Sequence, residues 1–126
     1  MAAVVLTAIG LVLVEASLEN TDGRVLARMG ATAYLFAGIL WVVAEALDLN
    51  RREQSFYPFV VAYVVMAYLA QAAIGGSLLP SGLLAAWICG ATLVWNIGWL
   101  AAFLITRLTA WIPMLHHVMP FVIGIA

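Results

Sequence analysis

Long apolar runs alternate along the chain with short polar clusters, and this alternation predicts the structural elements. A helix needs about 20 mainly apolar residues to cross ~30 Å of hydrocarbon, and the charged residues stand in clusters that divide stretches of about this length. We expect four membrane-spanning helices near residues 1–18, 29–47, 57–79 and 82–106. The predicted fold is all-α: an antiparallel four-helix transmembrane bundle forming a single domain.

The C-terminal segment 111–126, WIPMLHHVMPFVIGIA, follows a different pattern. From Pro113 onward it offers only ~21 Å of helix, so we expect a short re-entrant or interfacial helix, or the start of a further span. Pro120 cannot donate a hydrogen bond to the carbonyl of His116, which predicts a kink and an irregular turn within PMLHHVMP. The apolar ends also lead us to expect that the natural chain continues beyond Ala126.

Composition narrows the classes of function. The chain is 67% hydrophobic and 9% charged with a mean hydropathy of +1.13, whereas soluble domains are roughly 25% charged, so the lipid bilayer is the expected solvent. A net charge of -1 gives no basic field, which argues against a nucleic-acid partner. The positive-inside rule favours as cytoplasmic the side carrying Arg51, Arg52 and Arg107 over the side carrying Arg24 and Arg28.

Two acidic residues, Glu15 and Glu45, lie within apolar segments. The predicted topology separates them by roughly 20 Å of depth, whereas carboxylates that cooperate in hydrolysis lie within ~10 Å. Each is therefore either half of an ion pair that fixes a helix end or a separate ion or ligand site. Their candidate partners are basic residues near the same helix ends: Arg24 or Arg28 for Glu15, and Arg51, Arg52 or Arg107 for Glu45.

A lone carboxylate in the first span of a short four-span chain resembles the plan of the small multidrug resistance exporters. The resemblance rests on chain length, span count and Glu15. It supports a hypothesis of transport in which Glu15 carries the coupling proton.

The neighbouring histidines His116 and His117 project about 100° apart on a helix, so one of them is expected to face inward. Metal-binding pairs on helices prefer spacings of three or four residues, so no metal site is predicted. Three readings remain open: interfacial or hydrogen-bonding side chains without a special function, a proton or substrate contact shared with Glu45, and a single ligand to a chlorophyll-like pigment. The sequence assigns no cofactor.

The fourth predicted span carries two neighbouring stripes. Small residues recur every four positions, a spacing typical of close helix packing, at Ala86, Gly90, Val94, Gly98 and Ala102. Beside them Trp95 and Trp99 lie too deep for an interfacial aromatic belt, so they either pack on another helix or wall a cavity for a hydrophobic ligand. Asn96 and Gln71 are each expected to make interhelical hydrogen bonds rather than to form a site.

No catalytic signature is present, so the sequence names no catalytic residue and leans away from an enzyme. The leading hypothesis is a non-catalytic membrane subunit or hydrophobic-ligand-binding bundle in a homo-oligomer or with other membrane subunits. The alternative is a small proton-coupled transporter or channel, and the third is a membrane enzyme using a histidine and Glu45 on a lipid. The candidate site residues are Glu45, His116, His117, Glu15, Trp95, Asn96, Trp99 and Arg107.

Overall fold

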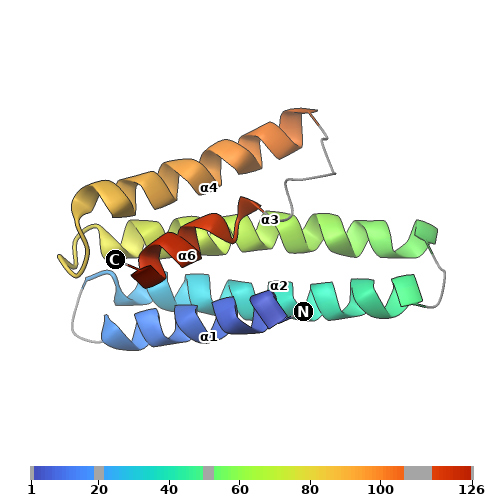
Figure 1. The fold of residues 1–126 in the computed structure, drawn as a ribbon, viewed down its shortest axis with the longest axis horizontal. Helices are drawn as coiled ribbons and strands as arrows, with labels where there is room; N and C mark the ends of the chain where they lie inside the picture. The colour runs from blue at the N-terminus through green and yellow to red at the C-terminus, as the bar shows by residue number, and fades with distance from the viewer. Residues whose placement is uncertain (1, 19–21, 50–52, 107–114, 126) are drawn as a thin grey trace.

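The computed structural model describes residues 2–18, 22–49, 53–106 and 115–125. Its elements are α1 (Ala2–Ser17), α2 (Arg24–Leu49), α3 (Glu53–Leu78), α4 (Ala86–Thr106) and α6 (Val118–Ile125). Helices α1 to α4 lie side by side, and successive helices run in opposite directions (Figure 1). The prediction of an all-α chain is confirmed for these residues.

Three helices in the described part of the chain are long and apolar enough to cross a membrane: Arg24–Leu49, Phe56–Leu78 and Ala86–Thr106. Helix α1 is apolar but has 16 residues, which cover ~24 Å, less than the ~30 Å of a hydrocarbon core. By helix length, the structure therefore supports three of the four predicted spans.

The helix boundaries differ from the sequence prediction where polar residues extend or delay a helix. Helix α2 begins at Arg24 rather than near residue 29, because the residues that precede the apolar stretch are also helical. Helix α4 begins at Ala86 rather than at residue 82. Gly82 has a φ of 68°, in the left-handed region that glycine adopts without strain, so it belongs to the turn before α4.

Helix α3 packs against both α2 and α4, and glycines allow these contacts to be close. A Cβ atom added at Gly30 of α2 would lie 2.7 Å from the carbonyl oxygen of Ala70 on α3. A Cβ atom at Gly75 would lie 3.0 Å from the backbone nitrogen of Leu93 on α4. The backbones of the three long helices therefore approach one another at positions where no side chain intervenes.

The small-residue stripe of α4 does not form this contact, so its role as a packing face stays a prediction. Val94 is 71% exposed, and a Cβ atom added at Gly90 or Gly98 would meet nothing within 4 Å. The buried face of α4 carries larger side chains, including Cys89, Thr92, Asn96 and Phe103. Because Gly75 of α3 already supplies the close approach, α4 can present these larger residues to it.

The C-terminal helix α6 has eight residues and covers ~12 Å, and its role as a re-entrant, interfacial or further spanning segment stays a prediction. His116 and His117 lie in a turn immediately before it, as the irregular PMLHHVMP segment predicts. The kink expected at Pro120 stays a prediction, and Pro120 is the third residue of α6. In this first turn its missing N–H removes no hydrogen bond from the helix interior.

Candidate functional site

His116 is the centre of a buried cluster of aromatic and polar side chains. Its side chain is fully buried, and its Nε2 atom lies 2.8 Å from the Tyr63 hydroxyl and 3.4 Å from the Tyr34 hydroxyl. The ring of Tyr68 stands edge-on to the imidazole, with 5.7 Å between ring centroids. We call His116, Tyr34, Tyr63 and Tyr68 the His116 cluster.

The cluster lies deep between the two longest helices. Tyr34 is ten residues after Arg24, the first residue of α2, and Tyr63 is ten residues after Glu53, the first residue of α3. Each tyrosine is therefore ~15 Å along its helix. The prediction that one histidine faces inward is confirmed, and the contacts of His116 agree with the hydrogen-bonding interpretation. The turn before α6 allows its side chain to enter between α2 and α3.

His117 joins the same region to helix α1. It is partly buried, its Nδ1 atom lies 3.4 Å from the Thr7 hydroxyl, and its ring centroid lies 3.9 Å from that of His116. The Thr7 contact is long for a hydrogen bond and therefore weak. Together the two histidines contact α1, α2 and α3.

A tryptophan of α4, Trp95, contacts the backbone just before His116. Trp95 donates a hydrogen bond from Nε1 to the Leu115 carbonyl oxygen over 3.0 Å, and Trp99 packs edge-on against Trp95 with 5.8 Å between ring centroids. This geometry supports the packing interpretation of Trp95. A buried indole N–H needs an acceptor, and here the backbone just before His116 provides it.

Glu15 and Glu45 lie far apart, as predicted. Arg28 contacts Glu15 through Nε and Nη2, each 3.0 Å from Oε1, and Arg24 Nε is 3.9 Å away. Glu45 lies 17 residues after Arg28 on α2, ~25 Å along the helix. Within the described residues, no hydrogen bond or ion pair connects Glu45 to either histidine.

The expected basic partners of Glu45 are Arg51, Arg52 and Arg107, and they lie outside the described residues. The ion pair of Glu15 is confirmed, whereas that of Glu45 stays a prediction. In the part of the chain that the structure describes, no three His, Cys, Asp or Glu residues form a group able to hold a metal ion.

Two buried amides occur where α3 meets α4. Gln71 and Asn96 are both almost fully buried, and Asn96 Nδ2 donates to the carbonyl oxygen of Thr92 on its own helix over 2.8 Å. Asn96 Oδ1 and both amide atoms of Gln71 have no hydrogen-bond partner in the described structure. The prediction that these amides make interhelical hydrogen bonds is therefore wrong for the described structure, although the close approach of Gly75 to Thr92 places the two amides at the same level.

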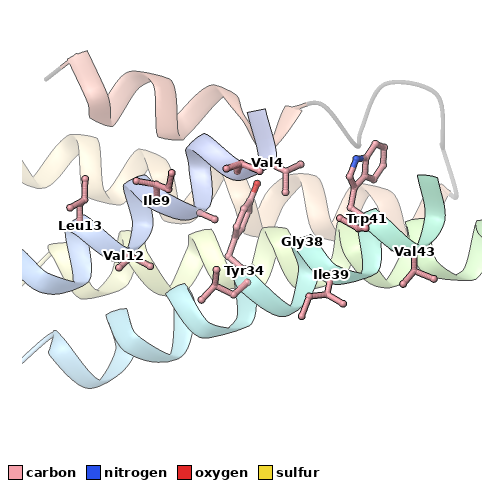
Figure 2. A pocket seen from close by; sticks show the side chains of 13 residues that line it. Val4, Ile9, Val12, Leu13, Tyr34, Gly38, Ile39, Trp41 and Val43 are labelled. Atoms are coloured by element: carbon pink, nitrogen blue, oxygen red, sulfur yellow. The ribbon is translucent and has the colours of Figure 1, made fainter. Parts of the chain in front are cut away.

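An apolar groove of about 560 Å³ lies between α1 and α2, and we call it the α1–α2 groove (Figure 2). Aliphatic side chains form most of its wall, and Gly38 leaves a gap in the α2 surface. Two lining residues carry polar side-chain atoms, Tyr34 and Trp41. Ligand sites commonly have volumes of ~300–1,000 Å³, so this groove is large enough for a small lipophilic molecule.

A second cavity of about 490 Å³ lies between α1 and α6 and is lined in part by Thr7 and His117. Neither Trp95 nor Trp99 lines either of these two cavities. The sequence analysis did not single out Tyr34, Gly38 or Trp41. Their spacing of four and three residues, which places them on one helix face, is the signal that could have found them.

No known protein family, no curated protein and no solved structure matches this chain.

Proposed function

We propose that the protein is a membrane-embedded, non-catalytic bundle that holds a hydrophobic ligand in the α1–α2 groove. The observation that carries this proposal is the groove itself, with its volume of about 560 Å³ and its mainly aliphatic wall. Several lining side chains are also exposed on the outer surface, including Val5, Ile9, Leu13 and Ile39. A groove that is open along its side can receive a ligand laterally from the hydrocarbon of a bilayer.

The His116 cluster has a supporting role in this proposal. Tyr34 belongs both to the cluster and to the groove wall. Its hydroxyl contacts His116, so its ring is held in one orientation while one face of the ring contributes to the groove. A binding wall fixed by packing and hydrogen bonds requires less reorganisation when a ligand enters.

The proposal includes assembly with other membrane helices, preferably a second copy of the chain. The small-residue stripe of α4 faces outward, and Trp87 and Val94 on the same helix are about 70% exposed. Small residues at this spacing allow the close backbone contact that drives helix association in lipid, where the hydrophobic effect between helices is absent. The stripe supports an interface on the side of α4 turned away from α3.

The first test is a native mass spectrum of the protein gently solubilised from its own membrane. A retained lipophilic molecule supports the binding function, and a dimer or a complex with another chain supports assembly. A bare monomer contradicts both. If that bare protein then shows a proton-coupled flux that Glu15→Gln abolishes, transport replaces the binding function.

Two matched substitutions separate the two parts of the proposal. Gly38→Leu adds an aliphatic side chain on the face of α2 that lines the groove, where a Cβ atom would lie 3.5 Å from Val4 Cγ1, so it should reduce ligand retention at least severalfold and leave assembly unchanged. Gly98→Leu adds the same side chain on the outward face of α4, where a Cβ atom meets nothing within 4 Å. It should reduce assembly and leave ligand retention unchanged, so each variant is the control for the other.

A further inference from the structure

We infer that the cavity between α1 and α6 is a second binding site, and that it takes a neutral lipophilic alcohol whose hydroxyl group forms a hydrogen bond with His117. We call it the α1–α6 cavity. Its volume of about 490 Å³ is within the usual range of ligand sites, ~300–1,000 Å³. This inference goes beyond the proposed function, which concerns the α1–α2 groove alone.

The α1–α6 cavity and the α1–α2 groove lie on different sides of α1. Val5 and Val12 of this helix line the groove, whereas Thr7 and Gly10 line the cavity. Successive helical residues are about 100° apart, which places these two pairs on opposite faces of the helix. Leu13 is the one lining residue that the two share. A ligand can therefore occupy the cavity without entering the groove.

His117 offers the cavity a polar atom that a ligand can reach. The residue is partly buried, lines the cavity, and contacts the Thr7 hydroxyl through Nδ1 over 3.4 Å. Its other ring nitrogen, Nε2, makes no hydrogen bond within the described residues, and it is not one of the buried polar atoms there that lack a partner. His117 Nε2 therefore keeps accessible surface.

The chemistry of the wall favours a hydroxyl group on the ligand. Besides His117, no lining residue is ionisable, so a charged imidazole would be an isolated charge in an apolar wall and the neutral form is favoured. A neutral imidazole has one donor and one acceptor nitrogen. The Thr7 hydroxyl can donate to Nδ1 or accept from it, so Nε2 is the donor in one tautomer and the acceptor in the other. A ligand hydroxyl matches Nε2 in both tautomers, whereas a carbonyl oxygen only accepts.

A fatty acid matches the α1–α6 cavity less well than an alcohol. Its carboxylate would need a protonated His117, so two charges would leave water together. Thr7 is the other lining residue with a polar side chain, and it could share only one further hydrogen bond. The desolvation of such a buried pair commonly exceeds the attraction between its charges.

The depth of His117 argues against a phospholipid headgroup as the ligand. His117 follows His116, which contacts Tyr34, and Tyr34 lies ~15 Å along the ~39 Å of helix α2. In the proposed membrane placement, this level is near the middle of the ~30 Å hydrocarbon core. Headgroups lie outside that core, so the hydroxyl belongs to a molecule that itself enters the hydrocarbon, such as an isoprenoid alcohol.

The test compares farnesol, an isoprenoid alcohol, with the hydrocarbon in which a methyl group replaces its hydroxyl group. Binding to the detergent-solubilised full chain is measured by equilibrium dialysis against protein-free micelles, and the alcohol preference is the ratio of the two affinities. His117→Phe keeps an aromatic ring but removes both nitrogens. It should lower the alcohol preference about fivefold, the change given by one hydrogen bond of average net strength.

Two matched glycine variants locate the bound alcohol. Gly10→Leu adds a side chain on the face of α1 that lines the α1–α6 cavity, where a Cβ atom meets nothing within 4 Å. It should remove the alcohol preference. Gly38→Leu adds the same side chain in the α1–α2 groove, which His117 does not line, so it should keep the preference.

A spectroscopic readout on the wild-type protein does not require any variant to fold. The chain has two histidines, so nitrogen NMR of protein with isotope-labelled histidine gives few resonances. Farnesol should move the side-chain nitrogen resonances of one histidine, and the hydrocarbon probe should leave them in place.

The outcomes distinguish this inference from the proposed function. An alcohol preference that survives His117→Phe, with histidine resonances that farnesol does not move, overturns the role of His117. A preference that survives Gly10→Leu but is lost in Gly38→Leu places the alcohol in the groove, which overturns the second site and leaves the proposed function standing. A preference that only Gly10→Leu and His117→Phe remove supports the second site, even if the groove retains no ligand.

Discussion

The hydrogen bond between Tyr63 and His116 should contribute measurably to the stability of the bundle. Tyr63→Phe keeps the aromatic ring that packs against Trp41 and removes only the hydroxyl, which lies 2.8 Å from His116 Nε2. Net hydrogen-bond contributions are about 0.5–1.5 kcal/mol in proteins generally and average ~0.6 kcal/mol between membrane helices. The Tyr34 hydroxyl remains 3.4 Å from the same nitrogen, so the full cost of an unpaired group is avoided.

We therefore expect Tyr63→Phe to lower the free energy of unfolding by about 1 kcal/mol, a roughly fivefold change in the ratio of folded to unfolded protein. The measurement is unfolding in mixed micelles with increasing sodium dodecyl sulfate, followed by circular dichroism. Tyr57→Phe is the control, because Tyr57 is on the same helix and is 47% exposed. It should change the free energy by no more than ~0.5 kcal/mol.

The double variant tests whether Tyr34 and Tyr63 share one acceptor. Removing both hydroxyls deprives His116 Nε2 of both tyrosine contacts, so the loss should exceed the sum of the two single losses. If Tyr63→Phe instead matches Tyr57→Phe within ~0.3 kcal/mol, His116 is not held in the bundle by Tyr63, and our description of the cluster is refuted.

Three further substitutions test other parts of the structure by thermal denaturation in detergent. Gly30→Ala should lower stability by about 1–3 kcal/mol because its Cβ atom would meet a carbonyl oxygen of α3. Gly10→Ala on α1, where a Cβ atom meets nothing within 4 Å, serves as the control. Equal midpoints would show that α2 and α3 do not approach closely at Gly30. Gln71→Met should leave stability unchanged or raise it by up to about 2 kcal/mol, since it replaces a buried amide that has no hydrogen-bond partner in the described structure. A clear loss of stability would show that the Gln71 amide does make a hydrogen bond. Glu15→Gln should lower the free energy of unfolding by less than about 1 kcal/mol, because the side chain of its partner Arg28 is 61% exposed. This loss of stability should shrink at high salt. A larger loss that does not depend on salt would contradict an ion pair screened by solvent.

The sequence was sufficient to predict the helical class because apolar runs and charge clusters are local features. It was less reliable for helix faces. The stripe containing Gly90 and Gly98 has the right period for close packing, but a period does not say which neighbour the face meets. Gly75 on α3 provides the close approach, so the stripe of α4 was free to face outward.

The site was predicted only in part for a related reason. The angle between adjacent helical residues was enough to infer that one histidine turns inward. Its partners could not be identified, because Tyr63 and Tyr34 are 53 and 82 residues away from His116 along the chain. Which tyrosine of a uniformly apolar helix faces the interior depends on the rotation of that helix about its axis, and a sequence without clear amphipathic faces leaves this rotation undetermined.

The docking of the C-terminal segment has a consequence for the order of biogenesis. The tyrosines that contact His116 belong to α2 and α3, both synthesised earlier. The receiving surface can therefore be assembled before residue 116 leaves the ribosome. We expect His116 and His117 to dock after α2 and α3 have paired, so that a translational pause after α4 would leave α1 without its Thr7 contact to His117.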